Sequence, residues 1–214
     1  MDALAPLIPL IPALAALLIG VSHFGGLLNG KASEGTTFLI ASTSIYISAL
    51  LCLSLLWAGA NNLLAGSYQA GTWLNAGNLT IPVNFLSTGV GIVLSTLFAL
   101  LFVIIFRFSR NYLHSETGFH RFFMLLSLFA ASIFMILLSG NIIGTFIGWE
   151  LAGMCSFFLI AFAWHRDNAS TNACLVFVTN RIGDASFILG AALCYLWLGT
   201  LDWNSINTAD TRYT

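Results

Sequence analysis

The acidic residue Glu150 lies near the middle of a long apolar stretch, Asn141 to Trp164. About 20 apolar residues, rising 1.5 Å each, are enough to cross the hydrocarbon core of a bilayer. A carboxylate at that depth costs on the order of 3 kcal/mol, so it must face a protein interior or a wet cavity. Because such acids are rare and costly, the position predicts a residue that handles protons or ions. The alternative interpretation is a structural acid, hydrogen-bonded to a neighbouring helix.

A second charged group, Arg181 and Asp184, lies within the next apolar stretch. Residues spaced i, i+3 share one face of a helix, so the two side chains are close enough to pair. A bare arginine at this depth would be prohibitive, and the aspartate partly offsets its charge. The pair can fix helix packing, or it can tune Glu150 or a charge of a neighbouring subunit, and the two interpretations are compatible. The only lysine, Lys31, falls in a predicted loop, so we expect Glu150 to work with a cation from another chain or segment.

Other kinds of chemistry are not indicated by the sequence. The cysteines lie in apolar runs without CxxC spacing, which is typical of small buried side chains; they are Cys52, Cys155, Cys174 and Cys194. The histidines of the cation-rich loops are interpreted as surface residues; they are His114, His120 and His165. Without clustered cysteines or paired intramembrane histidines, we expect no flavin, haem, iron–sulfur cluster or metal, and therefore no catalytic redox site in this chain. We also expect no nucleic-acid partner.

Composition predicts the fold class. The chain is 58% hydrophobic and 7% charged, against roughly 25% charged residues in a soluble domain. We therefore predict an all-α, polytopic membrane protein with about six transmembrane helices. The expected spans are approximately 4–28, 38–58, 84–106, 122–139, 141–164 and 173–198.

Four regions follow from these spans. Residues 1–58 hold helices one and two, and residues 59–83 form an uncharged outer-face loop, compatible with a strand or hairpin on the membrane surface. Residues 84–198 hold helices three to six with the intramembrane charges, and residues 199–214 form a polar tail.

The cations predict an orientation. With six spans, the loops after helices one, three and five share one side of the membrane, and they carry Lys31, Arg107, Arg110, Arg121 and Arg166. Apart from the intramembrane Arg181, the remaining cation is Arg212, in the tail on the other side. Because cations accumulate in inner-face loops, both termini are predicted on the outer face of a bacterial plasma membrane or mitochondrial inner membrane.

The motifs around these charges carry a family resemblance. The stretch GNIIGTFIGWELAGMCSFFLIAFAW, followed by NRIGD, resembles the antiporter-like membrane subunit of respiratory complex I (NADH–quinone oxidoreductase), which is called chain 5 in mitochondria and chain L in bacteria. The segments SRNYLHSETGFHRFFMLLSLF and GTLDW are similar to the same family. The resemblance implies a subunit that translocates protons, driven by quinone reduction elsewhere in the complex. It implies that Glu150 interacts with a lysine on a seventh helix, and that Arg181 and Asp184 help couple neighbouring channels.

The resemblance also implies partners and shows departures. Expected partners are other membrane subunits of a complex I-like assembly and the lipid bilayer. Family members usually have an acidic residue in a D-x-L-S pattern where this chain has Asn84-Phe85-Leu86-Ser87. They also have about a dozen helices or more, so the resemblance covers the first third or so of a member. The seventh-helix lysine and the second inverted half must come from another chain or segment, and alone the chain is not expected to conduct.

Three alternatives remain open at this point. The same module occurs in multi-subunit cation/proton antiporters, which have no redox link. It also occurs in bicarbonate-uptake complexes, where proton flow drives hydration at a soluble partner. The third alternative is a truncated structural or assembly piece without transport.

Overall fold

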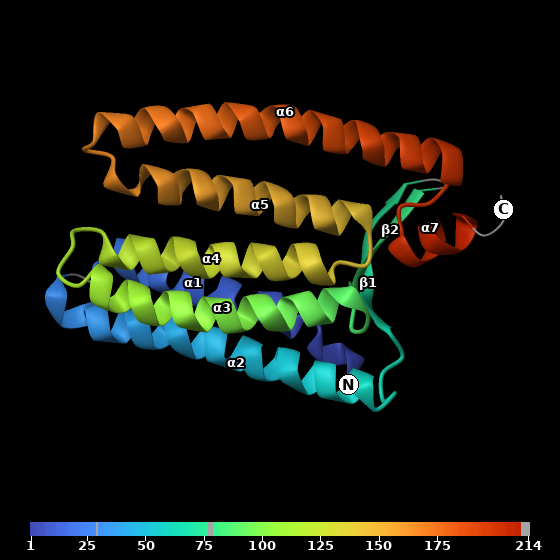
Figure 1. Cartoon of the computed structure of the whole chain (residues 1–214), viewed down its shortest axis with the longest axis horizontal. Coiled ribbons are helices and arrows are strands. Elements are labelled where there is room, and N and C mark those ends of the chain that lie inside the picture. Colours follow the sequence, from blue (N-terminus) through green and yellow to red (C-terminus); the bar gives the residue numbers. More distant parts are fainter. Residues whose placement is uncertain (29, 77–78, 211–214) are drawn as a thin grey trace.

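The computed structural model describes residues 1–28, 30–76 and 79–210, and helices dominate this part of the chain (Figure 1). The helices are α1 (Leu7–Phe24), α2 (Glu34–Ala60), α3 (Val90–Tyr112), α4 (Phe119–Leu138), α5 (Ile142–Ile160), α6 (Asp167–Leu198) and α7 (Trp203–Asp210). Single 3-10 turns occur at η1 (Asp2–Leu4), η2 (Lys31–Ser33) and η3 (Ala161–Ala163). Six of the helices in the described residues are long and apolar enough to cross a membrane, which confirms the predicted class of polytopic helical membrane protein.

One region departs from the helical pattern. Strands β1 (Ser67–Ala76) and β2 (Leu79–Leu86) form an antiparallel hairpin, with Ser67 opposite Leu86 and Asn75 opposite Thr80. The predicted start of the third helix at residue 84 is therefore wrong, because residues 84–86 pair with β1 and α3 begins at Val90. Pro82 within β2 is compatible with a two-stranded sheet, whose outer edges need no further partner.

The hydrophobic core belongs to the first four helices. Its largest fully buried side chains include Phe106 of α3 and Phe123 and Phe134 of α4, and Phe106 and Phe123 meet edge to face with ring centroids 5.8 Å apart. Figure 1 shows α1, α2, α3 and α4 side by side as one block. Ser48 of α2 donates a 3.0 Å hydrogen bond to the carbonyl of Ile8 in α1, which satisfies the hydroxyl inside this block.

Helices α5 and α6 extend the block on one side only. Of the residues in the most apolar stretch of each helix, half are buried in α4, against 11% in α5 and 6% in α6. Helix α5 packs on α4 through Gly148, where a Cβ would lie 2.9 Å from the backbone nitrogen of Ile136 and 3.0 Å from the carbonyl oxygen of Ser132. Helix α6 packs chiefly on α5, so α5 and α6 form a layer on one side of the block of α1–α4 (Figure 1).

A polar junction ties this layer to the hairpin. Asn141 caps α5, since its Oδ1 accepts a 2.7 Å hydrogen bond from the backbone nitrogen of Gly144. Its Nδ2 donates to the carbonyl of Pro82 at 2.6 Å and to Oδ1 of Asn84 at 2.7 Å. Asn84 in turn donates to Asp202, which precedes α7, at 2.5 Å. Three segments that are far apart in the sequence thus meet at one end of the bundle.

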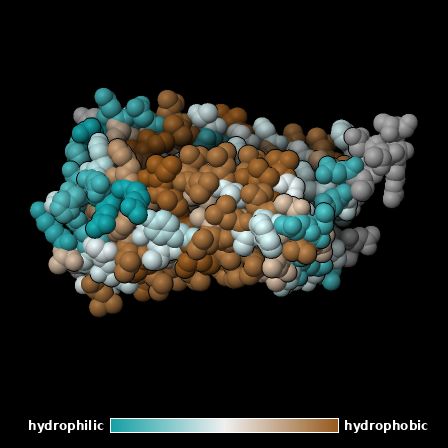
Figure 2. Space-filling view, turned by 60° about the horizontal axis from the view of Figure 1, so that its bottom comes forward, coloured by the Kyte–Doolittle hydropathy of each residue, from teal (hydrophilic) through white to brown (hydrophobic). Residues whose placement is uncertain are grey.

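The two ends of the bundle differ in charge. The connections α1–α2, α3–α4 and α5–α6 lie at the end opposite the hairpin (Figure 1), and the cations predicted to share a side are on or beside them, namely Lys31, Arg107, Arg110, Arg121 and Arg166. Arg212 lies outside the described residues. Figure 2 shows a hydrophobic belt between hydrophilic ends.

Some predicted loops are helical. Helix α3 continues to Tyr112 and so includes Arg107 and Arg110, and α6 begins at Asp167 rather than at residue 173. Cations in the last turns of α3 are favoured by the negative end of its dipole. The predicted polar tail contains α7. Asp202 caps its first turn, because Oδ1 of Asp202 accepts a 3.0 Å hydrogen bond from the backbone nitrogen of Asn204.

Candidate functional site

The acid and the arginine singled out in the sequence are in direct contact. Glu150 lies on α5 and Arg181 on α6, and Nη2 of Arg181 donates a 2.6 Å hydrogen bond to Oε2 of Glu150. The interpretation that Arg181 could tune Glu150 is therefore compatible with the structure, and the cation expected from another chain or segment stays a prediction. Sequence spacing could not show this pair because its members are 31 residues apart on different helices.

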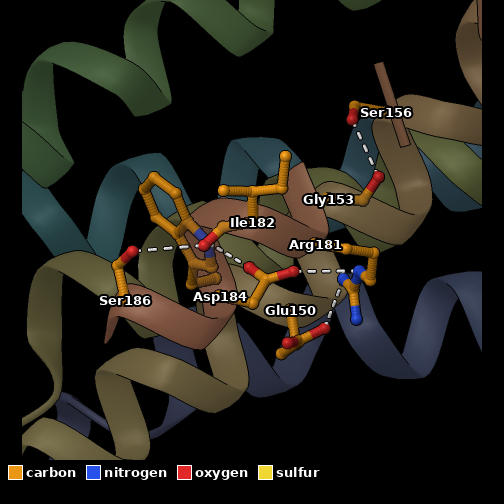
Figure 3. Close-up of polar contacts among 8 residues, drawn as sticks. Glu150, Gly153, Ser156, Arg181, Ile182, Asp184 and Ser186 are labelled. Atoms are coloured by element: carbon orange, nitrogen blue, oxygen red, sulfur yellow. Dashed lines mark hydrogen bonds and ion pairs between the residues drawn. The ribbon is translucent and has the colours of Figure 1, made fainter. Parts of the chain in front are cut away.

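The predicted pair within α6 also forms. Nε of Arg181 lies 2.9 Å from Oδ2 of Asp184, at an i, i+3 spacing. Figure 3 shows Arg181 between the carboxylates of Glu150 and Asp184. The contact has the distance of an ion pair without the angle of a hydrogen bond. One cation thus serves two acids, and we call Glu150, Arg181 and Asp184 the charged triad.

Two aromatic residues complete the surroundings of the triad. The indole Nε1 of Trp149 donates a 2.9 Å hydrogen bond to Oδ1 of Asp184. The guanidinium carbon of Arg181 lies 5.0 Å from the centroid of the Phe177 ring, a cation–π arrangement. Sequence analysis missed both residues. Trp149 could have been singled out from the sequence, because it is adjacent to Glu150 and because an indole N–H in an apolar span needs a hydrogen-bond acceptor.

Burial is uneven across the triad. The side chain of Asp184 is 6% exposed, that of Glu150 is 28% exposed, and that of Arg181 is 41% exposed. Asp184 is therefore the buried partner of Arg181, and Glu150 is the more exposed one.

Small residues shape the α5 side of the triad. Gly148 allows the close approach of α5 to α4 described above. Gly153 faces α6 instead, where an added Cβ would lie 3.6 Å from Nδ2 of Asn180. Glu150 is thus placed between one tight helix contact and one roomier contact.

Of the three histidines interpreted as surface residues, His114 and His165 are exposed, and His120 is buried, which corrects the prediction for that residue. His120 is 6% exposed, its Nδ1 lies 2.7 Å from the hydroxyl of Thr37, and its ring stacks on that of His23 at a centroid distance of 5.2 Å. His114 is exposed but lies 2.8 Å from Oε2 of Glu34. The helical start of α4 at Phe119, instead of residue 122, carries His120 into the bundle. In the described residues, no three His, Cys, Asp or Glu side chains gather in a way that could hold a metal ion.

Two family models match this chain. The model described as NADH-ubiquinone oxidoreductase (complex I), chain 5 N-terminus, matches residues 73–123. The model described as NADH:quinone oxidoreductase/Mrp antiporter, transmembrane, matches residues 139–213. The second match contains the whole charged triad.

Curated relatives match over most of this chain. It is 34% identical to the chloroplast NAD(P)H-quinone oxidoreductase subunit 5 of Chaetosphaeridium globosum, over 91% of this chain and 29% of that protein. It is 28% identical to the corresponding protein of Zygnema circumcarinatum, over 94% of this chain and 28% of that protein. It is 30% identical to NAD(P)H-quinone oxidoreductase chain 5 of Synechocystis, over 95% of this chain and 30% of that protein. The chain therefore spans less than a third of the length of these relatives.

Proposed function

We propose that this chain, which belongs to the chain 5 family of antiporter-like membrane subunits of complex I, takes part in proton translocation across a membrane through its charged triad. In this proposal, quinone reduction elsewhere in the assembly drives proton transfer at Glu150. The names of the relatives are those of quinone oxidoreductase subunits, which favours this function over cation/proton exchange without a redox link or bicarbonate uptake.

The observation that carries the proposal is the shared arginine. Arg181 contacts two carboxylates that lie on different helices, at 2.6 Å and 2.9 Å. Charged side chains in a membrane span are costly and mark proton or ion pathways. A local ion pair that only offset the charge of Arg181 would need Asp184 alone, whereas Glu150, on another helix, is a second acid on the same cation.

The triad supports a simple proton-transfer step. While Nη2 of Arg181 is bound to Glu150, the guanidinium balances the charge of the carboxylate. When the contact opens, one proton takes the place of that cation on the carboxylate. When the contact closes again, the carboxyl group releases that proton. In this proposal, Nε of Arg181 stays in contact with Asp184 while the contact with Glu150 is open.

The proposal includes partners and an orientation. Other membrane subunits of a complex I-like assembly, or a further segment, supply the surface that covers α5 and α6, including the lysine that the family resemblance implies. The cation-rich end faces the inner side, and the hairpin end, with Asp2 and α7, faces the outer side.

The test is the substitution Glu150→Gln in the membrane complex that contains this chain. Glutamine keeps the volume and accepts a hydrogen bond from Arg181, so assembly should stay near normal. Proton pumping in sealed vesicles, measured per assembled complex, should fall by roughly tenfold or more, because removing a positioned proton-transfer group commonly costs about 100-fold.

Glu116→Gln is the matched control, because Glu116 is an exposed acid in the α3–α4 connection that does not contact the triad. It should leave pumping unchanged. Wild-type pumping by the Glu150→Gln complex, at equal abundance of the complex, would rule out the proposed role.

A further inference from the structure

A basic pocket lies at the cation-rich end of the first four helices, apart from α5 and α6. It has a volume of about 560 Å³ and is lined by Lys31, Glu34, Gly35, Arg110, Asn111, His114 and Phe119. These residues come from η2, the first turn of α2, the last turn of α3, the α3–α4 connection and the start of α4. Neither the charged triad nor the proposed proton transfer uses any of them.

The cations of the basic pocket have no acidic partner. In the described part of the chain, no ion pair joins a carboxylate to Lys31 or to Arg110. Lys31 is exposed. The guanidinium of Arg110 lies 4.7 Å from the centroid of the Phe38 ring, which restricts its position without neutralising its charge. Two positive groups thus face one cavity from different helical segments.

Among the residues that line the pocket, the one carboxylate is that of Glu34, and it already has hydrogen-bonding partners. Oε2 of Glu34 lies 2.8 Å from Nδ1 of His114, and Oε1 accepts a 3.2 Å hydrogen bond from the backbone nitrogen of Ser115. The side chain of Glu34 is only 10% exposed. Its charge therefore fixes the α3–α4 connection and the position of His114, and it leaves an excess of positive charge over the cavity.

A helix terminus adds to this field. Phe119 lines the pocket and is the first residue of the 20-residue helix α4. The residue before it, Gly118, has φ of 110° and no side chain with which to cap the helix. The N-terminus of a helix presents backbone N–H groups and a partial positive charge, which together favour an anion.

The aromatic end of α3 places the pocket near the depth of lipid headgroups. Phe108 and Tyr112 are exposed within the last turns of α3, as Arg110 is, and their rings stack with centroids 5.7 Å apart on another face of the helix. Tyrosine side chains at the end of a membrane span collect at the headgroup level. Basic pockets between membrane helices on the inner side are suited to anionic headgroups.

We propose that the basic pocket binds the phosphate group of an anionic ligand, with a phospholipid headgroup as its source. Lys31 and Arg110 supply the charge, and the N-terminus of α4 and Asn111 supply hydrogen-bond donors. The proposal does not depend on proton translocation.

The test measures lipid binding to the full chain purified in detergent, by native mass spectrometry. Phosphatidylglycerol should bind about tenfold more tightly than phosphatidylcholine, since each cation near a membrane surface adds a several-fold preference for anionic lipid. Lys31→Gln/Arg110→Gln should abolish the preference. Arg107→Gln removes a cation from the same end of α3 that contacts Tyr46 instead of the pocket, so it should retain the preference.

The source of the phosphate is separated by competition. If millimolar inorganic phosphate does not displace phosphatidylglycerol from the wild-type chain, the ligand is the lipid headgroup; if it does, the site is one for free phosphate. Lys31→Gln alone, in an exposed turn, keeps the Arg110–Phe38 contact and should lower the preference several-fold with unchanged helical content. A preference that survives the double substitution, or that is lost equally in Arg107→Gln, would overturn the proposal.

Discussion

The block of helices α1–α4 and the layer of α5 and α6 are both apolar, but they differ in how far their side chains are buried within this chain. No residue of α5 or α6 belongs to the main buried core, which is drawn from α1–α4, the hairpin and their connections. The layer instead carries the charged triad, in which Arg181 is 41% exposed. An arginine in a membrane span must face protein or water rather than lipid. The difference indicates that the first region is completed by its own side chains, while the second is arranged to meet another surface.

The largest expected effect tests the packing side of this comparison. Phe123 of α4 is fully buried and contacts the rings of Phe106 and Phe119. Phe123→Ala should lower the free energy of unfolding by about 3 kcal/mol, because it leaves a cavity in a close-packed region. Unfolding followed by circular dichroism in mixed micelles, with increasing sodium dodecyl sulfate, measures this loss.

Phe158→Ala is the matched control in α5, because Phe158 is exposed. It should change the free energy of unfolding by less than about 0.5 kcal/mol, as is usual for surface positions. Equal losses in the two variants would mean that α5 is as well packed as α4, and the comparison would fail.

Sequence predicted the spans well because each depends on local composition. Six apolar stretches of membrane-crossing length are visible without any knowledge of their neighbours, and six such helices are present in the described residues. The pairing of Arg181 with Asp184 was also predicted, since helical spacing alone brings them together. The Glu150–Arg181 contact was only one of the interpretations left open, because the register between two helices depends on side-chain packing that no local pattern records.

The hairpin was one of two structures that fitted residues 59–83, and the sequence could not decide between them for a related reason. Residues 59–83 contain no charge and many small polar side chains, so a loop and a surface strand fit the same composition. The carboxylate of Asp2 accepts hydrogen bonds from the backbone nitrogens of Ala65 and Gly66, at 3.2 Å each, and from the hydroxyl of Ser87. These partners are more than 60 residues away from Asp2 in the sequence, so only the folded chain shows that the hairpin is anchored to the N-terminus.

A smaller effect is expected at the junction between the two regions. Asn141 caps α5 and also bonds to Pro82 and Asn84 of the hairpin. Asn141→Ala should lower the free energy of unfolding by about 2 kcal/mol, because it removes a helix cap and leaves half-buried partners unsatisfied. Hydrogen exchange should show faster opening of the first turn of α5, with α1–α4 unchanged.

Asn61→Ala is the matched control for the junction. Asn61 is exposed, and its Nδ2 donates a 2.8 Å hydrogen bond to the carbonyl of Trp57 at the end of α2. The change should cost less than about 0.5 kcal/mol. If Asn141→Ala exchanges no faster than Asn61→Ala at α5, the layer is held by the α4 contact alone.

The smallest expected effect concerns the charged triad itself. Asp184→Leu removes one carboxylate partner of Arg181 and the acceptor of Trp149, yet Arg181 still has Glu150. Because Glu150 and Arg181 are partly exposed, the expected loss in the free energy of unfolding is only about 1 kcal/mol. Arg181→Met/Asp184→Leu should be no more stable than the single variant, since it leaves Glu150 without its cation. Adding Glu150→Gln to that pair should restore stability, because a neutral amide needs no cation, and unfolding in mixed micelles measures all three variants. If the double variant is already as stable as the wild type, Arg181 and Asp184 compensate each other alone, and Glu150 is not part of the same ionic group.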